Sequence, residues 1–197
     1  MAVMIPDVTR AALLSLDLQN AIVSIYTKGQ DQFLPRIAAV QNAARMCGMR
    51  VIHVQVGFRP GLPEIGSRNT LFAAIKNSPQ WQQMFQGPPG AIHPAVAPKA
   101  EDIVVTKHRV SAFTGTDLEM ILRSQETETL ILMGIATSGV VLATLLHACD
   151  ADYRVIVVKD CCADHDLELH DCLTGKVFPR PATVVSAAEL IEALQPK

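Results

Sequence analysis

Apolar runs of strand length alternate with segments of helical spacing along most of this chain. The runs at residues 11–16 and 50–56 have the length and apolar content of strands. Between them, apolar residues recur every three to four positions over residues 33–48, which predicts a helix that stops at Gly48. These three segments together predict a β-α-β unit.

The same alternation continues toward the C-terminus. Further strands are predicted at 102–106, 129–133, 154–158 and 183–186, and further helices at 117–124, 140–151, 167–174 and 187–194. Alternating strands and helices favour a parallel sheet with helices on both faces. We therefore expect one domain over residues 1–197, with a three-layer α/β/α fold and a roughly six-stranded, mostly parallel central sheet.

Residues 57–100 interrupt this alternation and hold most of the prolines. A connection of this length in a compact domain is usually a lid or a binding loop, here with a short helix expected at 69–76. Exposed loop side chains are often merely solvated, and a tryptophan can simply anchor a loop on the core. The candidate substrate contacts in this loop are nevertheless Phe58, Arg59, Arg68, Asn69 and Trp81.

Charge and composition narrow the class of partner. The 17 basic and 19 acidic residues give a net charge of −2 and form no long runs, which argues against nucleic-acid or membrane-surface binding and favours a small-molecule substrate. No secretion signal and no apolar run of about 18 residues is apparent, so we expect a cytoplasmic protein. A hydrophobic fraction of 49% with only 18% charged residues predicts a homo-oligomer, a dimer or tetramer.

The five cysteines are odd in number and irregularly spaced. That pattern fits neither a disulfide framework nor a paired Cys-x-x-Cys metal site, so we expect reduced thiols.

Three positions at the ends of predicted strands are candidates for chemistry. Asp17 follows the first strand, where it could either act on a ligand or cap the next segment. Lys107 ends the third, where a lone lysine is often a solvated charge. The segment 134–144 joins the fourth strand to a helix, a junction that presents backbone N–H groups and one side chain at the ligand-binding edge of a sheet. Val140 occupies the place of that side chain.

Four motifs, taken in order, resemble the isochorismatase-like hydrolase family, which includes nicotinamidases, carbamoyl-amide hydrolases and isochorismatases. They span almost the whole chain. They are Asp17-x-Gln19-Asn20, Lys107-x-x-x-Ser111-Ala112-Phe113, Gly134-Ile135-Ala136-Thr137 and Val157-Val158-Lys159-Asp160-x-Cys162-Ala163-Asp164.

The resemblance implies roles for particular residues. It places an acid-base carboxylate at Asp17 and its lysine partner at Lys107, and it puts the cysteine of the amide-cleaving members at Val140. It further implies a cis peptide at Ile135–Ala136, with the N–H groups of Ala136 and Val140 forming an oxyanion hole. Gln19 and Thr137 are expected to contact the substrate.

The chain departs from that family at two places. Valine has no lone pair or ionisable proton, so it cannot form the thioester of the thiol-dependent members. Cys161 and Cys162 lie near the same edge of the sheet, and we interpret them as structural thiols. The carboxylate-histidine cluster that holds metal in nicotinamidase-like members is missing from residues 56–62, so we expect no metal and no other cofactor.

The first hypothesis is a cysteine-independent hydrolase of a small metabolite, with Asp17 as general acid/base. The reaction would be the hydrolysis of an ether or a vinyl ether. One alternative is a non-catalytic relative that keeps the pocket to bind a metabolite or to assemble with a partner. A third reading is an amide hydrolase in which Asp17 activates water directly.

Overall fold

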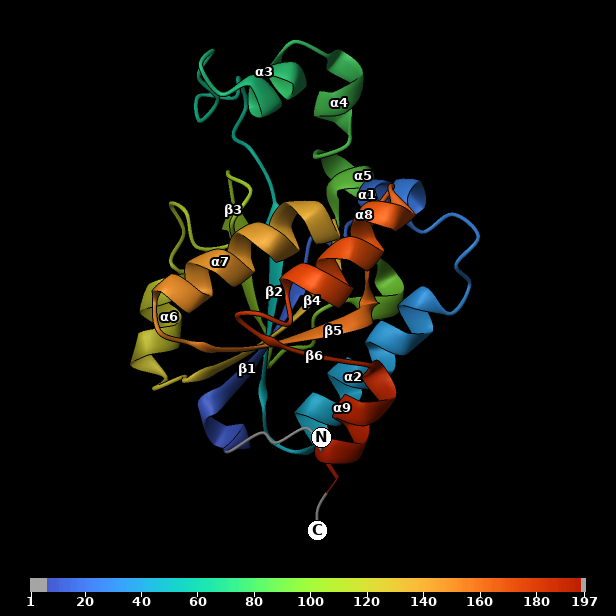
Figure 1. Ribbon diagram of the computed structural model, residues 1–197. Helices are drawn as coiled ribbons and strands as arrows, with labels where there is room; N and C mark the ends of the chain where they lie inside the picture. The colour runs from blue at the N-terminus through green and yellow to red at the C-terminus, as the bar shows by residue number, and fades with distance from the viewer. Residues whose placement is uncertain (1–6, 196–197) are drawn as a thin grey trace.

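A six-stranded parallel sheet forms the centre of the protein, as seen in the computed structural model, which describes residues 7–195 (Figure 1). Its strands lie in the order β3-β2-β1-β4-β5-β6, and every neighbouring pair is parallel. The predicted α/β fold is therefore confirmed. The strands are β1 (Ala11–Leu16), β2 (Arg50–Val56), β3 (Ile103–Lys107), β4 (Thr129–Ile135), β5 (Arg154–Ala163) and β6 (Thr183–Val185).

Helices cover both faces of this sheet. One face packs against α1 (Asn20–Tyr26), α2 (Phe33–Met46) and α9 (Ala187–Ala193). The other packs against α6 (Leu118–Ser124), α7 (Leu142–Asp150) and the segment η4 (Leu173–Val177), which follows α8 (Leu167–Cys172). A short turn of helix, η1 (Val8–Arg10), precedes β1.

Alternation along the strands explains why there are two cores. In β1, Leu13 belongs to the core under α2 and α9, whereas its neighbours Ala12 and Leu14 belong to the core under α6 and α7. Successive side chains of a strand point to opposite faces, so a strand buried on both sides is apolar throughout. All six residues of β1 are buried accordingly.

The long connection between β2 and β3 holds four short helices, of which only the first was expected. They are α3 (Thr70–Lys76), α4 (Pro79–Gln83), α5 (Gly87–Gly90) and η2 (Pro94–Val96). A small apolar cluster of Leu62, Ile65, Phe72 and Ile75 holds the first part of this loop together. Figure 1 shows α3 and α4 standing above the carboxyl end of the sheet.

Outside the long loop, two elements differ clearly from the sequence-based expectation. The helix α1 was not predicted, because seven residues that begin with a polar Asn20 are too few to display a helical period. β5 was expected to end at Val158 but continues to Ala163. The polar pair Lys159 and Asp160 hid this extension, and it lies where the register of β5 against β4 shifts.

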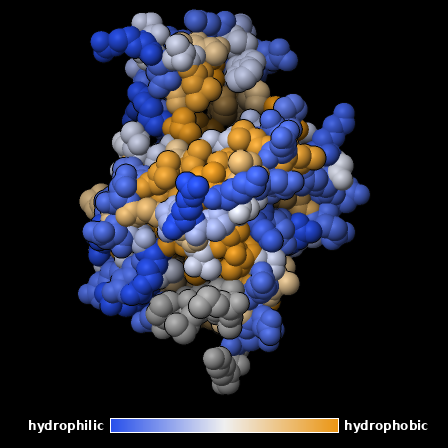
Figure 2. Space-filling model, in the orientation of Figure 1, coloured by the Kyte–Doolittle hydropathy of each residue, from blue (hydrophilic) through white to orange (hydrophobic). Residues whose placement is uncertain are grey.

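Apolar side chains also reach the surface. Leu146 on α7, Leu167 and Leu169 on α8, and Trp81 on α4 are exposed, and α8 buries none of its residues. Figure 2 shows apolar surface over α7 and α8 and on the α3–α4 segment. Homo-oligomer formation remains a prediction. Within residues 7–195, none of the helices has the length and hydrophobicity needed to cross a membrane.

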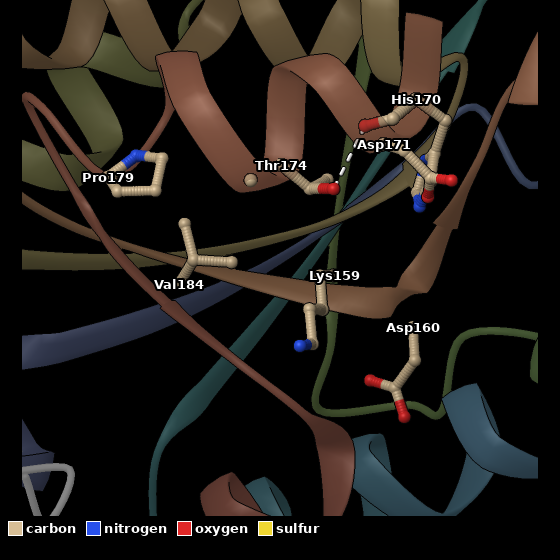
Figure 3. Close-up of a pocket in the computed structure, with 8 residues that line it drawn as sticks. Lys159, Asp160, His170, Asp171, Thr174, Pro179 and Val184 are labelled. Carbon is tan, nitrogen blue, oxygen red and sulfur yellow. Dashed lines mark hydrogen bonds between the residues drawn. The ribbon is translucent and has the colours of Figure 1, made fainter. Parts of the chain in front are cut away.

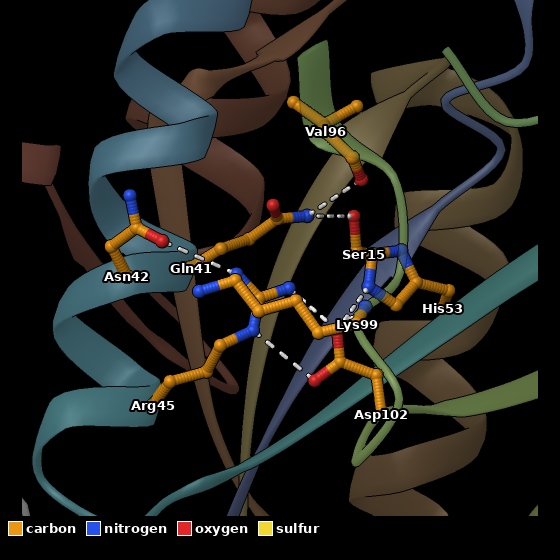
Figure 4. A network of polar contacts seen from close by, with 8 residues as sticks. All are labelled: Ser15, Gln41, Asn42, Arg45, His53, Val96, Lys99 and Asp102. Atoms are coloured by element: carbon orange, nitrogen blue, oxygen red, sulfur yellow. Dashed lines mark hydrogen bonds and ion pairs between the residues drawn. The ribbon is translucent and has the colours of Figure 1, made fainter. Parts of the chain in front are cut away.

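A buried polar network joins β2 to the segment that leads into β3 (Figure 4). The Asp102 carboxylate accepts hydrogen bonds from Arg45, from the Lys99 backbone N–H at 2.8 Å, and from His53 Nε2, which lies 3.1 Å away. His53 Nδ1 is buried and has no hydrogen-bond partner among residues 7–195. Burial lowers the pKa of His53, and hydrogen bonds from Arg45 hold the pKa of Asp102 below its usual value against the opposing effect of burial.

The His53 environment predicts how stability depends on pH. Its pKa is lower in the folded than in the unfolded chain, so the unfolded chain binds the proton first as the pH falls below about 6.5. The free energy of unfolding should therefore decrease from pH 7.5 toward pH 5 in urea titrations. His53→Gln, which cannot be protonated, should flatten the decrease; an equally steep decrease in that variant would contradict the assignment.

Candidate active site

The site lies where the strand order reverses. β1 and β4 are neighbours at the middle of the sheet, and the strands added after them extend in opposite directions. In an open parallel sheet, such a switch point leaves a crevice at the carboxyl ends of the two central strands. Leu16 pairs with Gly134, so the residue after β1 and the turn after β4 meet there.

Asp17 is the first residue after β1 and adopts a positive φ of 54°. Its backbone N–H donates to the Val54 carbonyl at 2.8 Å, which fixes the turn against β2. The residue is 6% exposed, and its Oδ1 atom has no hydrogen-bond partner within the described part of the chain. The position predicted from sequence is thus buried, with one carboxylate oxygen left unpaired.

Lys107 lies at the end of β3 and reaches across β2 to this carboxylate. Its Nζ lies 2.8 Å from Asp17 Oδ2, and it also donates to the Arg109 carbonyl at 3.0 Å. Burial raises the pKa of Asp17, and the nearby ammonium of Lys107 opposes that effect only in part. The structure brings the two predicted acid-base residues together as one buried ion pair.

The carboxyl end of β4 packs directly on β1. Gly134 has φ of 141°, and a Cβ atom there would lie 2.1 Å from the Leu16 carbonyl oxygen, so this position tolerates only glycine. The Ile135–Ala136 peptide is cis, as the resemblance implied. The kinked segment η3 (Thr137–Val141) follows, and its Ser138 N–H donates to Asp164 Oδ2 at 2.7 Å.

Two of the predicted turn residues are buried in different surroundings. Val140 is 2% exposed and packs in the core under α6 and α7. The fully buried Thr137 has its hydroxyl 2.8 Å from Nδ1 of His170 on α8. That the N–H groups of Ala136 and Val140 form an oxyanion hole stays a prediction.

Asp164 and His170 were given no role in the sequence interpretation. Asp164 follows β5 at the same edge of the sheet as Asp17, and this position after a predicted strand could have identified it as a site residue from the sequence. His170 gave no comparable signal, because its contact with Thr137 depends on the packing of α8 against η3.

Gln19 has a structural role in this arrangement. Its Nε2 donates to the carbonyls of Val56 at 2.9 Å and Gly90 at 2.7 Å, and its Oε1 accepts from the Val56 N–H at 2.8 Å. Both amide hydrogens are therefore used to join β1, β2 and the long loop. The geometry does not support the substrate contact predicted for this residue.

Replacing Gln19 should destabilise the protein. Gln19→Ala leaves the buried N–H and C=O of Val56 and the C=O of Gly90 without these partners, which should cost roughly 3 kcal/mol in urea unfolding. Gln55→Ala is the matched control, because the amide of Gln55 bonds Thr106 Oγ1 at the exposed surface. The control should lose less than about 1 kcal/mol, and equal losses would contradict the role assigned to Gln19.

Three of the five candidate substrate residues of the long loop contact other residues of the loop. Arg59 pairs with Glu64 at 2.6 Å, and Asn69 caps α3 through the Phe72 N–H. Phe58 packs edge-on against Phe72 and Phe85. Arg68 and Trp81 are exposed. Contact of these five residues with a substrate remains a prediction, since no described interaction joins their side chains to the Asp17–Lys107 pair.

The thiols nearest this edge are buried. Cys162 pairs in register with Gly134, and burial raises its pKa to about 12. Burial likewise raises the pKa of Cys161, with Asp160 adding to the effect. Among residues 7–195, His, Cys, Asp and Glu side chains form no group of three or more that could hold a metal ion.

Comparison with known proteins places this chain in a family. The isochorismatase domain profile matches residues 11–189. A maleamate amidohydrolase from Pseudomonas putida is 27% identical over 94% of this chain and 87% of its own length. An isochorismatase from Bacillus subtilis is 30% identical over 97% of this chain and 60% of its own length. The structure of an isochorismatase family protein from Burkholderia thailandensis superposes with a TM-score of 0.81 at 29% identity, covering 95% of this chain and 97% of that one. The chain belongs to the isochorismatase family of hydrolases and has amidohydrolases among its homologues.

Proposed function

We propose that this protein is a hydrolase that works without a cysteine nucleophile and uses Asp17 as its general acid. The observation that supports this proposal is that the two oxygens of the Asp17 carboxyl have different surroundings. Oδ2 is held by Lys107 at 2.8 Å, whereas Oδ1 is buried and unpaired among the residues described. Oδ1 is thus the oxygen positioned to carry a proton to a substrate.

The direction of the pKa shift supports an acid rather than a base. Burial raises the pKa of Asp17, so its carboxyl keeps a proton to higher pH than an exposed aspartate does. After the proton leaves, the Lys107 ammonium stabilises the new carboxylate. One residue thus holds the proton, and its partner stabilises the charge that the transfer creates.

A vinyl ether is the substrate that best suits this pair. Asp17 would protonate the terminal carbon of the C=C bond, which places positive charge on the carbon attached to the ether oxygen. Water then adds to that carbon and returns a proton to the Asp17 carboxylate, and the resulting neutral hemiketal breaks into an alcohol and a ketone. No step needs a protein nucleophile, which agrees with the valine at position 140.

The proposed absence of thiol chemistry is supported by the state of the nearby cysteines. The thiolate is the reactive form of cysteine, and burial raises the pKa of both Cys161 and Cys162 far above neutrality. Among residues 7–195, neither thiol has a basic partner that offsets burial: Arg36 lowers the pKa of Cys161 only as its smallest influence.

Water-mediated amide hydrolysis is the second candidate, because one relative is a maleamate amidohydrolase. In that reaction Asp17 would act as a base and remove a proton from the attacking water. The pH profile of kcat separates the two. An acid requires protonated Asp17, so the rate should fall as the pH rises through its raised pKa, whereas a base gives a rate that rises over the same range.

A substrate screen tests the proposal. Purified protein and the Asp17→Asn variant would be assayed with isochorismate, maleamate and nicotinamide under identical conditions. Turnover of isochorismate by the native protein alone would support the acid mechanism. Turnover of an amide alone would replace it with the second candidate. Saturable binding without turnover of any compound would contradict an enzymatic role and favour a metabolite-binding protein.

A further inference from the structure

A cavity of about 570 Å³ opens beside the carboxyl half of β5 (Figure 3). Its lining includes neither Asp17 nor Lys107. β6 pairs with β5 only as far as Val158, and β5 then continues through its register shift. That extension carries Lys159 and Asp160 to the cavity wall. The opposite wall comes from α8 and η4, and the segment that leads into β6 closes the side.

Two opposite charges in this cavity are free to bind a ligand. Lys159 and Asp171 both line it and are exposed, and neither takes part in the ion pairs formed within residues 7–195. Both carboxylate oxygens of Asp160, by contrast, already have partners. Arg36 pairs with its carboxylate at 3.3 Å, and its other oxygen accepts the Ala187 N–H at 2.7 Å. The available groups are therefore one ammonium and one carboxylate, on opposite walls.

Polar and apolar groups complete the lining. His170 is bonded through Nδ1 to Thr137, which leaves Nε2 as the ring nitrogen available to a ligand. Pro179 and Val184 form an apolar end, and Figure 3 shows them on the far side from Asp160 and Asp171. The cavity volume lies in the range usual for small-molecule sites.

We propose that this cavity binds a small zwitterion with an aliphatic body, of the class of a branched-chain amino acid. Lys159 would take the carboxylate, Asp171 the ammonium, and Pro179 and Val184 the aliphatic part. The unpaired Asp171 carboxylate disfavours a doubly charged anion such as phosphate. A ligand here also lies against His170, whose ring holds Thr137 in the turn beside the candidate active site.

Amide-resolved NMR titration of the full chain with L-leucine tests this site. We expect saturable shifts at residues 159, 171 and 174 and at Thr137. Two analogues test the two charged groups of the ligand separately. 4-Methylpentanoate lacks the ammonium and 3-methylbutylamine lacks the carboxylate, and each should bind at least about threefold more weakly than L-leucine. Lys159→Gln and Asp171→Asn should each weaken L-leucine binding by a similar factor.

Matched variants on the same elements serve as controls. Lys176→Gln and Glu168→Gln remove exposed charges from η4 and α8 that do not line the cavity, and they should leave L-leucine binding unchanged. Absence of saturable shifts with L-leucine would overturn the proposal. Equal binding of 4-methylpentanoate would overturn its zwitterion specificity, and equal weakening by the control variants would overturn the assigned contacts.

Discussion

Asp17→Asn is expected to lower kcat by about 100-fold to 10,000-fold, the range that a positioned general acid contributes. Asparagine has nearly the same shape, but it has no carboxyl proton to donate and no charge to pair with Lys107. The loss should lie in kcat for whichever substrate the native protein turns over. Steady-state kinetics at saturating substrate measure it.

The same exchange at an exposed position is the control. Asp117→Asn removes one negative charge from the surface, where the Asp117 side chain does not cap α6, and kcat should remain within about twofold. Because Asp17→Asn also leaves Lys107 buried without its partner, circular dichroism must show that the variant is folded. A folded Asp17→Asn protein with native kcat would show that Asp17 is not the general acid.

Gly134→Ala is expected to destabilise the protein by more than about 4 kcal/mol or to prevent folding. The new methyl group would lie 2.1 Å from the Leu16 carbonyl oxygen, and φ of 141° is unfavourable for any residue with a Cβ. Relief would require β1 and β4 to separate at the centre of the sheet, in a protein class whose total stability is about 5–15 kcal/mol. Urea unfolding gives the difference.

Gly66→Ala is its matched control, since no atom lies within 4 Å of the place that its new methyl group would take and φ is ordinary. Its free energy of unfolding should stay within about 1 kcal/mol of the native value. If Gly134→Ala were equally mild, the close approach of the turn to β1 would not hold in solution.

The fold was predictable because strand and helix periods differ clearly in this chain. β1 is apolar at every position but one, as expected of a strand buried on both faces, and α2 repeats its apolar residues with a helical period. The short elements were not predictable. α1 and α4 have seven and five residues, and they depend on packing against the loop and the sheet rather than on their own pattern.

The site was predictable to the extent that it depends on strand ends. Asp17 and Lys107 lie at the ends of strands whose carboxyl ends share one edge, which predicted their place at that edge, whereas their pairing was implied by the family resemblance. Gln19 shows the limit of that reasoning. Its place near the edge indicated a ligand contact, but the carbonyls that it bonds belong to Val56 and Gly90, which are distant in sequence.

The central claim is that the reaction proceeds without a thiol, and the activity of a protein with Cys161→Ala and Cys162→Ala tests it most directly. The substrate would be the one identified by screening, and the folded fraction would be measured in parallel so that rates refer to folded protein. We predict a kcat within about threefold of the native value, and Asp17→Asn in the same background should still abolish turnover. A folded double-alanine protein without activity would contradict it.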